Sequence, residues 1–172
     1  MIRFFVFVIV VTLSLTSCDM ATKKSIYNSK IKADSIIVDK SEHSLYLLKN
    51  GKVIRDYNAR FGFNPVGDKV YEGDGRTPEG KYHITHKNYN SKYFLSLLVS
   101  YPNEEDRLTA QKIGKNPGGA IMVHGQPNEA GWPERMKNKN RDWTFGCIAL
   151  SNNDMVNVYS MVTVNTPILI RR

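Results

Sequence analysis

One histidine and one cysteine in the C-terminal half of the chain are the residue types that nucleophilic catalysis requires. His124 follows the apolar run Ile121–Val123, and Cys147 begins the run Cys147–Leu150. Roughly twenty polar, Gly- and Pro-containing residues separate them, enough to loop out and bring the two side chains together. Because a free thiol is only about 3% thiolate at pH 7, a cysteine nucleophile needs a base. An imidazole can act as a general base or in a preformed thiolate–imidazolium pair.

The N-terminal residues have the pattern of a bacterial lipoprotein signal. Arg3 precedes the apolar run Phe4–Leu15, which is shorter than the roughly twenty residues of a membrane-spanning helix. The run ends in Leu-Thr-Ser-Cys18, which resembles the lipobox, in which the cysteine is diacylated and becomes the new N-terminus. We therefore predict a signal peptide over residues 1–17 and a lipid-anchored tether over 18–33, with an exported, periplasmic or cell-envelope location. A plain signal peptide that happens to contain a cysteine is the alternative.

This export signal changes the interpretation of Cys147. If Cys18 is acylated or removed, Cys147 is the only remaining thiol and has no intramolecular disulfide partner. A lone thiol outside the cytoplasm is liable to oxidation, so its retention needs a reason. A buried, inert cysteine is the common alternative. The accompanying His124 and Gly146 favour catalysis.

Composition and patterning predict one mainly β domain with a few short helices over residues 34–172. The 172-residue chain is 41% apolar, enough for a real core, and carries a net charge of +8. Its lysines are dispersed, without a basic block or a nucleic-acid-binding motif, so we expect no nucleic-acid partner. Strands are predicted at residues 35–38, 44–48, 53–57, 59–63, 81–85, 93–101, 121–123 and 166–170, and helices at 104–115 and 155–162. Asn50-Gly51 predicts a hairpin turn, and the cluster Ser151–Asp154 predicts an N-cap for the second helix. Residues 64–80, rich in glycine and proline, are predicted to form a loop.

Three ordered motifs resemble the L,D-transpeptidase catalytic domain (YkuD-type) family. Its pattern of His-Gly, a spacer and Ser/Thr-x-Gly-Cys-Ile/Val matches His124-Gly125 and the segment TFGCI at 144–148. The segment DGRTPEGKY at 74–82 resembles the Gly-rich loop that precedes a strand in the family. Further similarity at residues 100–103 and 142–149 points to a branch of small exported murein L,D-transpeptidase-like proteins, which includes members that cut amide links. The resemblance covers roughly residues 35–170 and implies a single-domain β-sandwich.

The resemblance also implies roles for the site residues. Cys147 would attack a carbonyl of a peptidoglycan stem peptide to form a thioester, and His124 would accept and return the proton. A backbone carbonyl near Gly125 would orient the imidazole. Gly146 lets substrate approach the backbone, and the N–H groups of Gly146 and Cys147 are natural oxyanion donors. We predict substrate contacts for Arg141, Trp143, Thr144 and Phe145, although Thr144 could equally stabilise the turn, and Trp143 and Trp132 could equally belong to the core.

The chain departs from the family at one position. Ala149 stands two residues after the cysteine, where most members have an arginine. Arg141 and Arg60 are candidates to replace that side chain.

The other polar residues of the chain are expected to be structural. We predict no metal and no cofactor, since His83 and His86 lack the companions of a zinc site. They and His43 are expected to be surface or structural residues, and Glu72, Asp74 and Glu79 to be turn residues and solvated charges.

The predicted activity is a peptidoglycan L,D-transpeptidase, a monomer whose cysteine carbapenems would acylate. The alternatives are a cysteine amidase using water as acceptor and a catalytically silent cell-wall-binding module. A papain-like protease is excluded by the order of the two groups, because papain-type enzymes place the cysteine before the histidine.

Overall fold

The computed structural model describes residues 29–128 and 141–172. The predicted signal peptide over 1–17, the lipidation site Cys18, most of the tether over 18–33 and Trp132 lie outside the described residues.

The described chain begins with an antiparallel meander. It consists of β1 (Ser35–Asp39), β2 (Ser44–Lys49) and β3 (Lys52–Asn58). Asn50 and Gly51 connect β2 to β3 with φ values of 51° and 71°. Two consecutive positive φ angles are the requirement of the tight hairpin turn that an Asn-Gly pair favours. The predicted hairpin is therefore confirmed.

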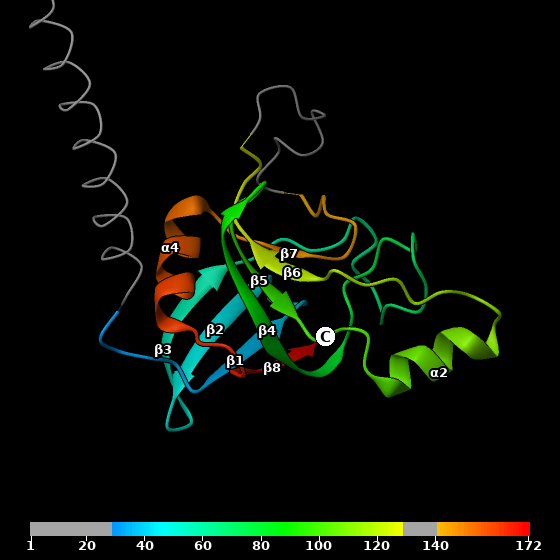
Figure 1. The fold of residues 1–172 in the computed structure, drawn as a ribbon, viewed down its shortest axis with the longest axis horizontal. Helices are drawn as coiled ribbons and strands as arrows, with labels where there is room; N and C mark the ends of the chain where they lie inside the picture. The colour runs from blue at the N-terminus through cyan, green and yellow to red at the C-terminus, as the bar shows by residue number, and fades with distance from the viewer. Residues whose placement is uncertain (1–28, 129–140) are drawn as a thin grey trace, which may run out of the picture.

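Within residues 29–128 and 141–172, eight strands form one mixed sheet, which confirms the predicted mainly β, single-domain fold. The other elements in chain order are β4 (Gly80–Ser91), β5 (Phe94–Val99), α2 (Glu104–Lys112), β6 (Met122–His124), β7 (Ile148–Ala149), α4 (Asn152–Met161) and β8 (Pro167–Arg171). The strand order is β3-β2-β1-β8-β4-β5-β6-β7, with parallel pairing at β1/β8 and β6/β7 (Figure 1).

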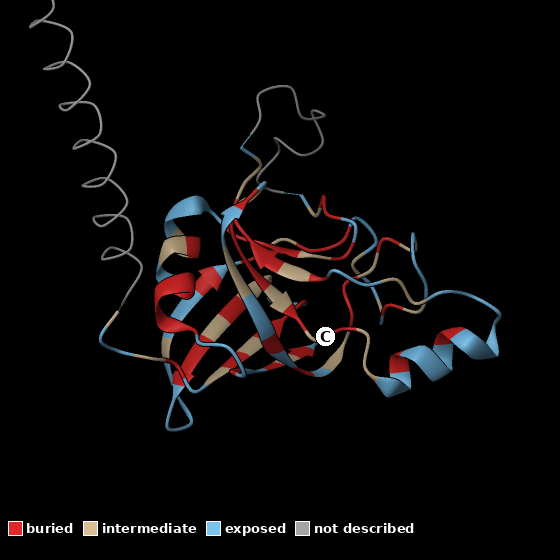
Figure 2. Cartoon of the chain, in the orientation of Figure 1, coloured by how far each residue is buried: buried red, intermediate tan, exposed pale blue. Residues whose placement is uncertain are grey.

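Strand β4 joins the two halves of the sheet. Its first four residues, Gly80–His83, pair with β8, and its remainder pairs with β5 through two register shifts. One apolar core is shared by the two halves: Ile36 and Leu47 come from the first half, Leu97 and Ile148 from the second, and Met155 from α4. Figure 2 shows this buried interior continuing from the strands onto the inner face of α4. The sandwich is thus built from a single continuous sheet.

The two described helices differ in how they are attached. In α4 the N-cap Ser151 accepts a hydrogen bond from the Asp154 N–H, as predicted for this cluster. Helix α2 projects from the body of the domain and buries only Asp106 and Ala110 (Figure 2). It ends at Lys112, three residues before the predicted end, because Gly114 turns the chain with a φ of 64°. Neither helix in the described ranges is long and apolar enough to span a membrane.

The predicted strand over residues 59–63 is wrong. The segment makes only two isolated bridges, Arg60 with Ala149 and Gly62 with Thr144. These bridges run in opposite senses, so no continuous ladder can form. Gly62 also lies so close to the loop that a Cβ there would meet the Gly75 carbonyl oxygen at 2.1 Å. The segment serves as a backbone support for the stretch that contains Cys147.

Candidate active site

The parallel pair β6/β7 places His124 and Cys147 on the same face of the sheet. Val123 pairs with Ile148 and His124 with Ala149. Val123 and Ile148 are buried in the main core, so His124 and Ala149 point to the opposite face. Cys147 directly precedes β7, two residues before Ala149. If the alternation of the strand is continued to Cys147, ordinary sheet spacings put its side chain on that face and its Cα roughly 8 Å diagonally from that of His124. A short thiol and a longer imidazole can meet across this diagonal.

The imidazole of His124 is fixed by a main-chain hydrogen bond. Its Nδ1 lies 2.7 Å from the carbonyl oxygen of Gly125. Because a carbonyl can only accept, Nδ1 carries the proton, and Nε2 of the neutral ring is left as the base. This is the backbone partner that the sequence analysis anticipates for His124, and no carboxylate is needed to orient the ring.

Two aromatic rings enclose the same imidazole. The ring of Tyr93 lies with its centroid 4.4 Å from that of His124, at an interplanar angle of 35°. Trp143 approaches His124 edge-on, at 5.7 Å and 66°. His124 is only 1% exposed as a result. Its ring therefore has one fixed position.

Burial keeps both members of the pair uncharged at rest. It lowers the pKa of His124 to about 4, against the opposing effect of the Gly125 carbonyl. It raises the pKa of the Cys147 thiol, although the Met122 N–H and the charge of Lys69 act in the opposite direction. Both shifts disfavour a preformed thiolate–imidazolium pair. Of the two modes that the sequence leaves open, the structure supports general-base activation.

Cys147 itself is half-buried and sits directly before β7. Its Sγ lies 3.7 Å from the carbonyl oxygen of Ala120. The Met122 N–H also faces the sulfur and favours its ionised form. The nucleophile is thus held against the backbone of β6 and the residues just before it.

The turn before Cys147 is stabilised by Thr144. Its hydroxyl donates to the Cys147 carbonyl at 2.7 Å and accepts from the Gly146 N–H at 3.1 Å. This settles the two alternatives for Thr144 in favour of the turn. It also corrects the oxyanion prediction, since the Gly146 N–H already has an acceptor inside the turn. The Cys147 N–H remains the candidate oxyanion donor.

Both glycines of the motif are required by close packing. Gly146 has a φ of 131°, and a Cβ there would lie 2.7 Å from the carbonyl oxygen of Arg76. At Gly125 a Cβ would lie 2.7 Å from Oδ1 of Asn152 and 3.1 Å from the carbonyl oxygen of Tyr93. The glycines therefore let two other segments approach the catalytic backbone, rather than leaving open space there.

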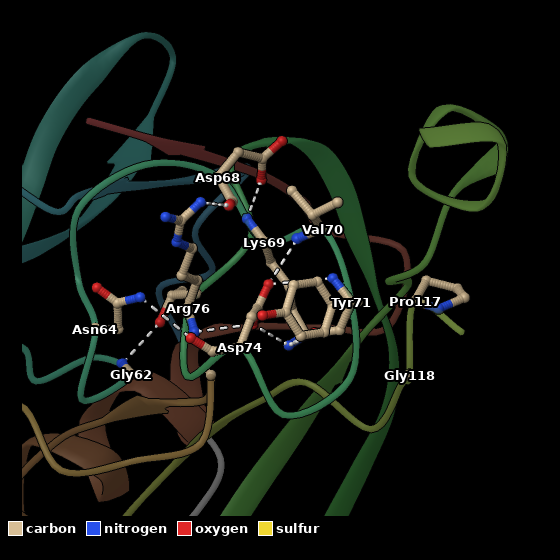
Figure 3. Close-up of polar contacts among 12 residues, drawn as sticks. Gly62, Asn64, Asp68, Lys69, Val70, Tyr71, Asp74, Arg76, Pro117 and Gly118 are labelled. Atoms are coloured by element: carbon tan, nitrogen blue, oxygen red, sulfur yellow. Dashed lines mark hydrogen bonds and ion pairs between the residues drawn. The ribbon is translucent and has the colours of Figure 1, made fainter. Parts of the chain in front are cut away.

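The loop over residues 64–80 packs against Gly146 and has a charged interior. The Asp74 carboxylate accepts from Lys69 Nζ at 2.8 Å and from the N–H groups of Val70, Tyr71 and Arg76 (Figure 3). The side chains of Lys69 and Asp74 are 3% and 4% exposed. Asp74 is a turn residue as predicted, but the prediction of a solvated charge is wrong. A buried carboxylate needs these donors because nothing else would replace its hydration.

The four residues predicted to contact substrate separate into two classes. Trp143 and Thr144 are each 3% exposed, and their predicted contacts with substrate stay predictions. Phe145 is 56% exposed and packs edge-on against the exposed ring of Phe63, with centroids 5.5 Å apart. Arg141 is also exposed. Buried side chains in this motif support the catalytic groups, and the exposed ones remain candidates for substrate contact.

Arg60 is the nearer of the two candidates to replace the family arginine. Its N–H and carbonyl exchange hydrogen bonds of 2.9 and 2.8 Å with Ala149. Directly paired residues project to the same face, so Arg60 extends from the face that bears Ala149 and His124. Arg141 has no such pairing with β7.

Of the remaining histidines, two are exposed and one makes a structural contact. His83 and His86 are exposed on β4, as predicted. His43 Nε2 lies 3.0 Å from the Asp142 carboxylate, whose other oxygen accepts from the Phe61 N–H. His43 is therefore structural and helps to hold the start of the catalytic turn. Within the described ranges, no group of histidine, cysteine and carboxylate side chains has the arrangement of a metal site.

Sequence reasoning missed Tyr93, Asp142 and Lys69. Lys69 lies in the Gly-rich loop and Tyr93 begins a predicted strand, and no sequence signal links either residue to His124 or Cys147. Asp142 stands in the stretch 142–149 used for the family resemblance, so its proximity to the site could have been predicted.

Comparisons with known proteins identify the family of this chain. The L,D-transpeptidase catalytic domain (YkuD) family model matches residues 33–170. YqjB of Bacillus subtilis (strain 168), whose name carries a provisional L,D-transpeptidase assignment, is 27% identical over 139 residues, covering 78% of this chain and 69% of YqjB.

Solved structures give the same result for the fold. The helical cell shape determining protein Pgp2 of Campylobacter jejuni superposes with a TM-score of 0.61 at 25% identity, over 83% of this chain but only 48% of Pgp2. An L,D-transpeptidase of Mycobacterium smegmatis matches with a TM-score of 0.51 at 18% identity, over 81% of this chain and 59% of that chain. This chain therefore spans about half the length of the Pgp2 chain that it resembles. With a family match over nearly the whole described region, the chain belongs to the L,D-transpeptidase catalytic domain (YkuD) family.

Proposed function

We propose that this protein is a cysteine-dependent acyltransferase that acts on peptidoglycan stem peptides through a thioester at Cys147. The observation that carries the proposal is the Nδ1 hydrogen bond from His124 to the Gly125 carbonyl, which leaves Nε2 as a base on the face of Cys147. A purely structural histidine would not need an unprotonated nitrogen on the same face as the chain's half-buried thiol.

In the first half-reaction the Cys147 thiol attacks the carbonyl carbon of the diamino acid at position three of the stem peptide, whose amide bond joins it to D-alanine. The thiol proton moves to Nε2 of His124 as the carbon–sulfur bond forms. The Cys147 N–H donates to the developing oxyanion, an interaction worth around 3 kcal/mol of barrier in comparable enzymes. Collapse of the tetrahedral intermediate breaks the carbon–nitrogen bond. The leaving D-alanine takes the proton from His124, and the peptide remains as a thioester.

In the second half-reaction an acceptor attacks the thioester. An amine of a second stem peptide gives a cross-link, whereas water gives a shortened stem peptide. In either case His124 removes the acceptor proton and returns a proton to the Cys147 sulfur. We take the amine as the natural acceptor, because the family model carries the transpeptidase description.

Mass spectrometry of purified protein incubated with tetrapeptide-containing peptidoglycan fragments tests the proposal. We expect loss of D-alanine and a mass gain that corresponds to an added amine. Loss of D-alanine with incorporation of water from ¹⁸O-water would assign the amidase activity in its place. No Cys147-dependent change in any fragment would contradict both and favour the binding module.

Matched variants separate catalysis from binding in this assay. Cys147→Ala removes the nucleophile, and His124→Gln removes the base. His86→Gln changes an exposed histidine on β4 and serves as the control that retains activity. A carbapenem gives an independent measure, because acylation of Cys147 would add the mass of the drug to the wild-type protein but not to Cys147→Ala.

We propose further that the protein acts in the cell envelope, anchored by lipid at Cys18. The support is the signal-like order of residues 1–18, in which a positive charge, an apolar run and small residues precede the cysteine. Cys18→Ala is expected to move the protein out of the membrane fraction. Retention of the variant in that fraction would contradict the lipid anchor.

An effect on cell shape is a corollary of peptidoglycan cross-linking. Its support is the likeness to Pgp2, which is named for cell shape determination. Deleting the gene should then change cell curvature or width, and restoring it with Cys147→Ala should not correct the change.

A further inference from the structure

Tyr93, in the connection between β4 and β5, makes two separate contacts with the pair His124 and Gly125. Its ring lies over the imidazole, with centroids 4.4 Å apart and planes tilted by 35°. Trp143 meets the same imidazole edge-on. The two aromatic rings and Ala149 form a small apolar cluster separate from the main core. The His124 ring is therefore enclosed by a packing unit of its own.

The second contact is made by the backbone of Tyr93. Its carbonyl oxygen accepts from the Gly125 N–H at 3.1 Å, and the Leu95 carbonyl shares this donor at the same distance. Gly125 is the residue whose own carbonyl accepts from His124 Nδ1. Tyr93 therefore holds the imidazole through its side chain and holds the acceptor of that imidazole through its main chain.

A strained turn gives the Tyr93 carbonyl this direction. The same oxygen accepts from the Leu95 N–H at 2.8 Å, and the residue between, Phe94, has a φ of 68°. An i to i+2 hydrogen bond across a residue of this φ is a γ-turn of the rare, strained kind. Positive φ at a bulky residue is unfavourable and persists only where the surroundings impose it. Strain at this point of the hairpin supports a role in the site.

The phenol of Tyr93 is also electrostatically coupled to Cys147. Burial raises the pKa of Tyr93, and the charge of Cys147 raises it further. The ring thus covers His124 and lies within electrostatic range of Cys147.

We propose that Tyr93 is a positioning residue for His124, through the packing of its ring on the imidazole and of its carbonyl on the Gly125 peptide. This inference rests on the proposed function for its kinetic consequences but not for its structural ones. The alternative is that Tyr93 only fills space beside Trp143. Positioning requires an aromatic ring and not a hydroxyl group, so that phenylalanine should replace tyrosine.

The test compares Tyr93→Phe, Tyr93→Leu and the control Tyr89→Leu in the purified protein. Tyr89 is a 71%-exposed tyrosine of β4. We expect Tyr93→Phe and Tyr89→Leu to retain kcat within about twofold. Tyr93→Leu should lower kcat by roughly 10- to 100-fold with KM nearly unchanged, the range expected when a catalytic group is displaced by a fraction of an ångström to 1 Å.

Nitrogen NMR of the His124 ring provides a readout that needs no turnover. In the wild type and Tyr93→Phe we expect the Nδ1–H tautomer and a ring that stays neutral down to about pH 4. In Tyr93→Leu we expect a mixture of tautomers and a midpoint shifted upward, toward the ordinary value of 6.5.

Each outcome decides the inference. An unchanged tautomer and unchanged midpoint in folded Tyr93→Leu would overturn it, as would a Tyr93→Phe variant that loses as much kcat as Tyr93→Leu. If the wild type proves inactive on every fragment, the proposed function fails, while the NMR comparison still tests Tyr93. If Tyr93→Leu does not fold, Tyr93→Met takes its place as a variant that fills similar volume without a ring.

Discussion

The two groups proposed to act in catalysis, His124 and Cys147, are held in different ways. His124 belongs to β6, is 1% exposed and is fixed mainly by side chains, with Tyr93 and Trp143 on its ring. Cys147 precedes β7 and is half-buried. It is fixed by a backbone turn that Thr144 closes and against which the loop over 64–80 packs. The base is therefore positioned by ring packing and the nucleophile by main-chain geometry.

This difference has a chemical reason. An imidazole has a large flat surface, so aromatic packing can restrain it while a single carbonyl selects its tautomer. A thiol has one small atom to position and a single rotatable bond before it, so its location follows the backbone. Substitutions that remove side-chain volume around His124 should therefore disturb the position of its ring. Substitutions that add a Cβ in the turn before Cys147 should disturb the backbone that positions the thiol.

Removing either reacting atom should have the largest effect. Cys147→Ala is expected to lower turnover by about 10⁴-fold or more, because no thioester can form. His124→Gln should approach the same loss, since the Cys147 thiol has a raised pKa and depends on the base. The measurement is D-alanine release from tetrapeptide fragments. A residual rate in Cys147→Ala above a tenth of the wild-type rate would break the assignment of the nucleophile.

Adding a methyl group at Gly146 should destabilise the turn that positions Cys147. Gly146→Ala combines a φ of 131° with a backbone oxygen 2.7 Å from the new Cβ, and we expect a loss of about 3 kcal/mol in the free energy of unfolding. Gly73→Ala is the control, because Gly73 has a φ of 91° but no atom within 4 Å of the new Cβ. It should lose only about 1 kcal/mol. Equal losses in urea unfolding would mean that strain alone, and not the approach of Arg76, requires Gly146.

As pH falls, the free energy of unfolding should decrease first because of the buried His124 and only at lower pH because of the buried Asp74. The unfolded chain binds a proton at His124 below about pH 6.5, whereas the folded chain does not until about pH 4. The free energy of unfolding should therefore fall by about 3 kcal/mol as pH drops through this window. His124→Gln should remove that part of the pH dependence. Denaturant unfolding at pH 7.5 and pH 4.5 measures it, and an identical pH dependence in wild type and variant would contradict the buried neutral imidazole.

The Asp74 carboxylate should affect the free energy of unfolding at a lower pH than His124 does. Burial raises its pKa, but Lys69 and three backbone N–H groups outweigh burial and lower the pKa below 3.8. Its contribution is present above pH 3.8 and is lost as pH falls through the lowered value. Asp74→Asn should thus change the unfolding free energy at pH 7.5 and leave the difference between pH 7.5 and pH 4.5 intact. A change in that difference would show that the loop and the His124 unit titrate together.

The smallest expected effect is at Thr144. Thr144→Val keeps the shape but removes the hydroxyl that joins the Gly146 N–H to the Cys147 carbonyl. We expect a loss of about 1–3 kcal/mol in the free energy of unfolding, since a buried donor loses its acceptor. Thr144→Ser should retain most of the stability. If the valine variant shows higher activity through a freed Gly146 N–H, then that group is an oxyanion donor after all.

Sequence patterns predicted elements well where neighbours in the chain also pair in space. The Asn50-Gly51 hairpin and the Ser151 N-cap are local, and both were found as predicted. Residues 59–63 have the composition of a strand, yet their partners are residues 144 and 149, more than eighty positions away. No local pattern specifies such bridges. The prediction failed because pairing geometry, and not propensity, decides whether an extended segment becomes a strand.

In the candidate site, too, the sequence predicted residue types in local motifs but did not predict which side chains are buried. The order of residue types brought His124, Gly146 and Cys147 together as a set, and the family resemblance added Gly125. Trp143 and Thr144 stand in the same motif, but proximity in sequence to Cys147 does not reveal which side chains point inward. Asp74 was predicted as solvated, since a Gly-rich segment resembles an exposed turn. Its burial follows from Lys69, five residues earlier, folding back to neutralise it.

By itself, the sequence determined the candidate reacting groups, the mainly β fold and the need for glycine beside each group, because these depend on residue type and local order. The tertiary structure alone decided the burial that disfavours charge on the pair, the enclosure of His124 by Tyr93 and Trp143, and the position of Arg60 beside Ala149. Each of these depends on how strands distant in sequence pack together. Burial and direction are properties of that packing, and they support the proposed roles of Cys147 as the nucleophile and His124 as its base.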